Sequence, residues 1–275
     1  MPRLNKKTRA KAKIQSTKLR IATHRAENRY VGKLRAIAAG YRAVYDRYLV
    51  RSAKAVVAVR GDAVKGPKAK PTGSPFVDFD TLETAVQRQL RAMVGTAFDE
   101  MWATVYKAHI ENSTLPRITI RQAQGPGSRL VELYERKRED SIKLVENAQR
   151  VYSDQVREVF SNPDNFGVRV EELQAKLLER GNVSESRAEL IARDQTLKTL
   201  GGINEVRQRE AGVNSYTWST SNDERVREEH QELEGQVFSW DSPPEPGHPG
   251  EPIQCRCIAI PVIDELADLD NLEAF

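Results

Sequence analysis

The chain has 275 residues, of which 39% are hydrophobic and 30% are charged, so it can bury a core but must keep a large polar surface. It has no apolar run near the ~18 residues that a membrane-spanning helix needs, and its basic N-terminus lacks the apolar segment of a secretory signal. Two cysteines are too few for a disulfide-stapled secreted domain. We therefore expect synthesis in the cytoplasm, no membrane partner, and an elongated helical protein rather than a compact enzyme.

The net charge of +4 conceals a strong asymmetry along the chain. Residues 1–70 contain 20 lysines and arginines but three acidic residues, and the first 25 residues contain no acidic residue. Mutual repulsion there predicts a mobile arm that a nucleic acid such as DNA would order, because phosphate contacts release counterions. A solvated tail and a basic transit peptide are the alternatives. The predicted DNA contacts are Lys6, Lys7, Arg9, Lys11, Lys13, Lys18, Arg20 and Arg25.

Apolar residues at helical spacing predict long helices along most of the chain. The first is expected at Tyr30–Val59, where its tyrosines either pack in a core or stack on bases. A linker rich in proline and glycine follows at 61–75. Two helices are then expected, from Asp80 to about Asn112 and from Ser128 to about Asn162. Joined by one connector at 117–127, they would form an antiparallel hairpin.

Glycines predict where two further helices end. The helix at 170–180 is expected to end at Gly181, and a second one, beginning near Ser184, to end at Gly212. The pair Gly201-Gly202 within the second helix predicts a kink, because glycine is a poor helix former.

After Gly212 the pattern becomes strand-like. Tyr216 and Trp218 alternate with polar neighbours, and further strands are expected at Val237–Trp240 and Cys255–Ile263. A short helix at 224–234 and a proline-rich loop at 241–252 separate them. The predicted fold class is therefore α+β, with long helices followed by a small α+β module. The expected segments are a basic arm and helix at 1–70, a helical hairpin region at 71–183, the C-terminal module at 184–263 and an acidic tail at 264–275.

His230, His248, Cys255 and Cys257 are the residue types of a structural zinc site. Two positions apart on a strand, both thiols would face one side, and the proline-rich loop would bring His248 close to them. The same spacing is poorly suited to a disulfide between the two cysteines. We therefore expect a zinc ion, and the alternative is two buried apolar cysteines with two surface histidines.

The cluster from Asp223 to His230 reads D-x-R-x-R-x-x-H, which allows an enzymatic interpretation. His230 would be a general base and Arg225 would hold a phosphate, as in a nuclease or a transferase. The sequence has none of the H-E-x-x-H, Walker, G-x-G-x-x-G or G-x-S-x-G motifs, so we expect a structural Arg–Asp network and no enzymatic activity. His109, near a predicted helix end, is expected to be solvated or to interact with the helix dipole.

Five motifs in residues 184–263 follow one another in a specific order. They are SRAELIARDQ at 186–195, WSTSNDERVREEH at 218–230, LEGQVF at 233–238, PGHPG at 246–250 and IQCRCIAIP at 253–261. In this order they resemble the phage Mu F-like head-morphogenesis family, the minor head or minor capsid proteins of tailed phages. The family commonly has Thr-Glu where this chain has Asp194-Gln195.

The resemblance implies a non-enzymatic structural component of the virion, in the phage head near the portal vertex. Its implied partners are the portal protein or the major capsid protein, together with phage genomic DNA, and its implied role is in head morphogenesis and DNA delivery. We expect Trp218, Trp240 and the proline-rich loop at 243–252 to anchor the protein interface, and the alternative is that Trp240 lies in the core of the module. The alternatives are a stand-alone non-specific DNA-binding protein, and a nuclease or transferase that uses Asp223, Arg225 and His230.

Overall fold

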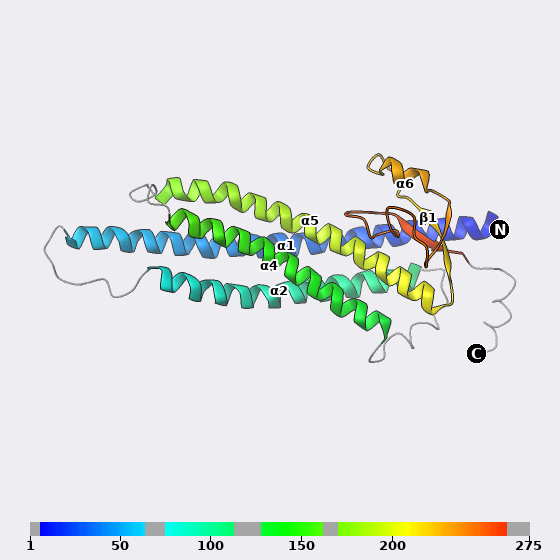
Figure 1. Ribbon diagram of the computed structural model, residues 1–275, viewed down its shortest axis with the longest axis horizontal. Helices are drawn as coiled ribbons and strands as arrows, with labels where there is room; N and C mark the ends of the chain where they lie inside the picture. Colours follow the sequence, from blue (N-terminus) through cyan, green and yellow to red (C-terminus); the bar gives the residue numbers. More distant parts are fainter. Residues whose placement is uncertain (1–5, 64–74, 113–127, 162–169, 263–275) are drawn as a thin grey trace. The chain divides into compact units, whose positions relative to one another are not determined.

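The computed structural model describes residues 6–63, 75–112, 128–161 and 170–262 (Figure 1). Within them it has long helices followed by a three-stranded sheet, which confirms the predicted α+β class. None of the helices in these ranges combines the length and the apolar character needed to cross a membrane. The elements are α1 (Lys6–Ala63), α2 (Pro75–Asn112), α4 (Arg129–Ser161), α5 (Val170–Glu210), β1 (Ser215–Ser219), α6 (Glu228–Glu232), β2 (Val237–Ser239) and β3 (Ile258–Pro261).

The described chain divides into two compact units, and each long helix contributes to both. Unit 1 comprises residues 1–30, 99–138 and 193–275, and unit 2 comprises residues 31–98 and 139–192. The segments predicted from the sequence follow chain order, whereas these units combine pieces distant in the sequence. The connector at 117–127 and the acidic tail at 264–275 lie outside the described residues.

Helix α1 begins at Lys6, so the prediction of a mobile arm is wrong for the described part of that segment. Leu19, Thr23 and Ala26 form a buried face at helical spacing, whereas Lys18 and Arg25 are exposed. Burial of the apolar face offsets the repulsion between the positive charges, which remain in solvent on the opposite side.

Helix α5 continues through Gly181, so the predicted helix end at that glycine is wrong. An interior glycine costs only about 1 kcal/mol relative to alanine, and no proline follows it to stop the helix. The predicted end at Gly212 is confirmed by its positive φ of 75°. There the Val213 N–H donates to Gln208 O and the Gly212 N–H donates to Arg209 O, which is the Schellman arrangement of a helix C-terminus.

In unit 2, an aromatic cluster forms the core between three helices. Tyr45 of α1 is fully buried, and its ring centroid lies 5.8 Å from those of Phe79 in α2 and Tyr152 in α4. Desolvation raises the pKa of Tyr45 to about 12. The interpretation of these tyrosines as core residues is confirmed for Tyr45, which is not available to stack on bases.

Ion pairs in unit 2 show that α2 and α4 run antiparallel, the arrangement predicted for a hairpin. Arg157, near the end of α4, lies 2.7 Å from Asp80 near the start of α2. Further along α2, Arg91 lies 3.3 Å from Glu146, which comes earlier in α4.

Unit 1 contains an antiparallel sheet with strand order β2-β1-β3. Tyr216 of β1 pairs with Phe238 of β2 and with Pro261 of β3. The predicted third strand begins later than expected, because β3 starts at Ile258. The buried core of this region consists of Tyr216, Trp218, Trp240, Cys255, Cys257 and Ala259.

His109 is 1% exposed, so the prediction that it lies in solvent is wrong. Its Nδ1 accepts a hydrogen bond from Arg207 at 2.6 Å, and its Nε2–H donates to Asn204 Oδ1 at 3.0 Å. The Asn204 amide then donates to the Ala259 carbonyl of β3. Burial, together with the charge of Arg207, lowers the pKa of His109 to about 3. A neutral imidazole therefore joins α2, α5 and β3 inside unit 1.

Candidate functional site

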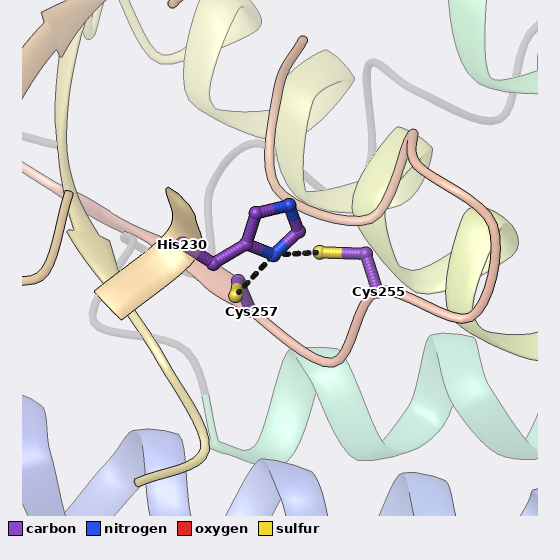
Figure 2. Close-up of side chains that lie close together, drawn as sticks. All are labelled: His230, Cys255 and Cys257. Atoms are coloured by element: carbon purple, nitrogen blue, oxygen red, sulfur yellow. Dashed lines mark hydrogen bonds between the residues drawn. The ribbon is translucent and has the colours of Figure 1, made fainter. Parts of the chain in front are cut away.

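Three buried side chains converge in unit 1: His230 from α6, and Cys255 and Cys257 from the loop before β3 (Figure 2). His230 Nδ1 lies 3.7 Å from Cys255 Sγ and 3.5 Å from Cys257 Sγ. One candidate ligand atom from each residue lies within 4.8 Å of the other two. Both cysteines are free thiols, so the residue types and their spacing suit a metal ion.

The loop that carries the cysteines is held to α5 by Asp194. The Gln254 N–H donates to Asp194 Oδ1 at 3.0 Å, and Lys198 lies 2.9 Å from the second carboxylate oxygen. Gln254 has a φ of 55°, a conformation that L-residues rarely adopt. A hydrogen bond to its backbone therefore fixes the turn that aims Cys255 at His230. This role of Asp194 could not be predicted from the sequence, because the carboxylate acts on the backbone of a residue far away in the chain.

The two thiols differ in acidity. The hydrogen bond from Cys257 lowers the pKa of Cys255 to about 6, and the same hydrogen bond raises the pKa of Cys257. The Gly250 N–H also points at Cys255 Sγ, at 3.5 Å. Cys255 is therefore the more acidic thiol of the pair, and a thiolate is the form that binds metals.

His248, the fourth predicted ligand, lies elsewhere in the core. Its Nδ1 is 2.9 Å from the Tyr216 hydroxyl, and its ring centroid is 4.9 Å from that of Trp240. Burial raises the pKa of Tyr216, so its hydroxyl stays protonated beside the His248 ring. The structure thus brings together three of the four predicted metal ligands.

A cavity of about 230 Å³ adjoins the three side chains, and all three line it. Arg193, Arg225, Arg227 and Arg256 also line it, together with His24 and Glu27 of α1.

The polar cluster from Asp223 to His230, which allowed an enzymatic interpretation, is held in place by hydrogen bonds to the rest of the module. Asp223 accepts two hydrogen bonds from Arg256, at 2.7 and 2.8 Å, and a third from the Arg225 N–H at 3.1 Å. Arg227 donates to the Ile253 carbonyl at 2.7 Å. These bonds are the structural Arg–Asp network expected from the sequence.

The predicted DNA contacts divide into two groups. Lys18 and Arg25 are exposed on α1. Arg20 instead donates from Nη2 to the carbonyl and the hydroxyl of Ser219, both at 3.0 Å, and burial lowers its pKa. Arg20 therefore joins α1 to β1 within unit 1. The side chains that lie outside the described residues are those of Lys6, Lys7, Arg9, Lys11 and Lys13.

We expect Arg20→Gln to lower the free energy of unfolding by about 1–2 kcal/mol, because it removes two hydrogen bonds from a charged donor. Urea denaturation followed by tryptophan fluorescence measures this loss. Lys18→Gln removes the same charge from an exposed position of the same helix, so its effect should be close to zero. Equal stabilities of the two variants would contradict the structural role of Arg20.

The fold and the site define a class of module: a three-stranded antiparallel sheet with a buried His–Cys–Cys cluster, continuous with long helices. Residues 154–260 match the model of the family described as Phage Mu protein F like protein. The match confirms the resemblance over a segment that includes α5, the sheet and the His–Cys–Cys cluster. Over this segment the chain is therefore similar to phage Mu protein F.

A curated relative, described as "Uncharacterized protein" from Haemophilus influenzae, is 38% identical over 125 residues. The match covers 45% of this chain and 28% of the relative, so it spans little more than a quarter of the relative's length. No solved structure matches the chain.

Proposed function

We propose that the protein is a minor head protein of a tailed phage, which joins the portal or the capsid to packaged DNA. The observation that carries this proposal is the family match over residues 154–260. The distribution of charge supports it, because one end of the sequence suits a polyanion and the remainder is acidic.

The DNA-binding surface in this proposal is the exposed basic side of α1. Lys18 and Arg25 lie there, and the five basic residues that precede them in α1 belong to the same predicted set. Contacts of this kind go to phosphates, so binding would be independent of sequence and would weaken steeply as salt rises.

The proposed interface with portal or capsid lies on the sheet module. The prediction that Trp218 and Trp240 anchor it is wrong for the free protein, because these side chains are 0% and 2% exposed. Val237 on the edge strand β2 and Ile253 in the loop before β3 are instead 45% and 68% exposed. We propose these apolar groups as the anchors, since burial of apolar surface is the main favourable contribution to most protein–protein association.

The two alternative functions fit the geometry less well. A nuclease or transferase would need Asp223 and His230 free to act, but Asp223 is paired with Arg256 and His230 Nδ1 faces the two thiols. A stand-alone DNA-binding protein shares the basic side of α1 but would need no capsid partner.

Co-sedimentation of the full chain with procapsids tests the proposal. We expect incorporation only when portal or capsid protein is present, and a loss of about tenfold in the double variant Val237→Glu/Ile253→Glu, since burying two carboxylates in an interface is costly. Leu190→Glu is the matched control, because Leu190 is 52% exposed on α5 and belongs to unit 2, whereas the sheet belongs to unit 1. DNA binding without any association with procapsids would favour the stand-alone DNA-binding protein.

The DNA contact gives a separate prediction. Each phosphate contact contributes a slope of about −0.9 to the logarithm of the binding constant against the logarithm of salt. The variant Lys18→Gln/Arg25→Gln should therefore flatten the slope by up to about 2, as measured by fluorescence anisotropy on duplex DNA. Lys107→Gln/Lys143→Gln removes the same charge from exposed positions on α2 and α4 and should leave the slope unchanged. Identical slopes for both variants would exclude this side of α1 as the contact.

These substitutions test DNA binding more directly than a deletion of residues 1–25, because the deletion would also remove Leu19 and Arg20. Both belong to the buried side of α1, and Arg20 bonds to Ser219. A truncated chain would lose stability together with charge, so the two effects could not be separated.

A further inference from the structure

We propose that His230, Cys255 and Cys257 bind one zinc ion, with the fourth coordination position open to the adjoining cavity. This centre is independent of any partner in the phage head, because all of its ligands come from one unit of this chain.

The two nitrogen–sulfur distances fit tetrahedral zinc. Zinc lies about 2.3 Å from a cysteine sulfur and about 2.0–2.1 Å from a histidine nitrogen, and tetrahedral angles then separate nitrogen from sulfur by about 3.6 Å. His230 Nδ1 lies 3.7 Å from one sulfur and 3.5 Å from the other. Both nitrogen–sulfur distances therefore match those expected around one tetrahedral zinc ion.

The chemistry of the donors fits as well. Two thiolates and one neutral imidazole cancel the charge of Zn²⁺, so the buried complex has no net charge. Coordination through Nδ1 places the remaining imidazole proton on Nε2, which is buried and makes no hydrogen bond among the described residues. Glu229 Oε1 lies 3.7 Å from that nitrogen. A metal-bound histidine usually donates this proton to a carboxylate, and Glu229 would have to move closer to accept it.

The fourth position has no protein ligand among the described residues that group with these three. His248 is directed to Tyr216 instead. Because His230, Cys255 and Cys257 all line the cavity of about 230 Å³, solvent can complete the tetrahedron from that side. Zinc sites with three protein ligands and one solvent molecule exchange that solvent for other ligands.

The ion would connect helix α6 to the loop before β3, two segments with little regular secondary structure. Helix α6 has five residues, and the cysteines lie in a loop rather than in β3. Because Trp218 packs against His230, with ring centroids 5.4 Å apart, tryptophan fluorescence should report loss of the metal.

The test measures metal in the full chain, purified without chelators and reconstituted with zinc. We expect about one equivalent per chain, and a loss of at least about tenfold in affinity for His230→Gln, Cys255→Ser and Cys257→Ser. His248→Gln is the matched control and should retain the ion. Should the cysteine variants fail to fold, removal of zinc from the wild type by a chelator, followed by tryptophan fluorescence, provides the same comparison.

Cobalt substitution tests the open position. The absorption bands of the cobalt-loaded protein should shift when azide is added, because azide can replace a bound solvent molecule. Less than about a tenth of an equivalent of zinc in the reconstituted wild type would overturn the site. An equal loss of zinc from His248→Gln would overturn the ligand set, and an azide-insensitive spectrum would overturn the open position. Since no capsid protein takes part, these outcomes are independent of the proposed function.

Discussion

Gly201→Ala is expected to lower the free energy of unfolding by about 2 kcal/mol, although alanine is the better helix former. A Cβ at this position would lie 2.8 Å from the Pro249 carbonyl oxygen and 3.2 Å from Gly250 Cα. Both are backbone atoms, so neither can move aside without displacing the proline-rich loop. The close approach of this loop to α5 therefore requires glycine, and the clash outweighs the gain in helix propensity.

Three other helix glycines provide matched controls for this prediction. A Cβ added at Gly32 or Gly40 in α1 would have no atom within 4 Å, so alanine there should stabilise the protein by about 0.5–1 kcal/mol. At Gly202 a Cβ would meet only the flexible side chain of Leu133, at 2.9 Å, so the loss should be smaller than at Gly201. Urea denaturation measures all four. A gain in stability for Gly201→Ala, equal to that for Gly32→Ala, would contradict the packing argument.

These glycines show what the sequence could and could not predict. Periodicity and helix caps were sufficient for α2 and α4, because those features are local. The role of Gly201 was not predictable, since its partner Pro249 belongs to a distant loop and the clash exists only in the folded chain. Gly181 was expected to end a helix that continues through it, because one interior glycine costs too little to stop a helix.

The sequence likewise predicted one part of the candidate site correctly and another part incorrectly. Residue types alone identified His230, Cys255 and Cys257 as a group, and the structure brings them together. They predicted His248 incorrectly as a neighbour of these three, because the path of the proline-rich loop decides where that ring points. The His248 ring packs against that of Trp240.

His109 is the clearest case of a residue whose surroundings reverse its sequence-based interpretation. Position near a helix end predicted solvent, but Arg207 and Asn204 of α5 enclose the ring. The Trp240 indole N–H extends the network by donating to Gln208 Oε1 at 3.1 Å. A proton added to His109 would place a second positive charge beside buried Arg207 and remove the acceptor at Nδ1.

The free energy of unfolding should consequently decrease as the pH falls from 6.5 toward about 3. The unfolded chain takes up the His109 proton near the ordinary pKa of 6.5, whereas the folded protein resists until about 3. The unfolded state thus binds more protons between these values, so the contribution of His109 is complete above pH 6.5 and is lost as pH falls toward 3. The loss is about 1.4 kcal/mol per pH unit, or about 2 kcal/mol at pH 5.

His109→Gln isolates this effect, because glutamine can donate to Asn204 and accept from Arg207 but does not titrate. Urea denaturation of wild type and variant at about pH 7.5 and about pH 5 gives four free energies of unfolding. We expect the wild type to lose about 2 kcal/mol more than the variant between the two values, since all other titrating groups are common to both. The variant should be the less stable protein at the higher pH, where the imidazole network is intact, and the difference should shrink or reverse at the lower pH. Parallel losses in both proteins would show that the His109 ring is protonated in the folded state, with Arg207 displaced from Nδ1.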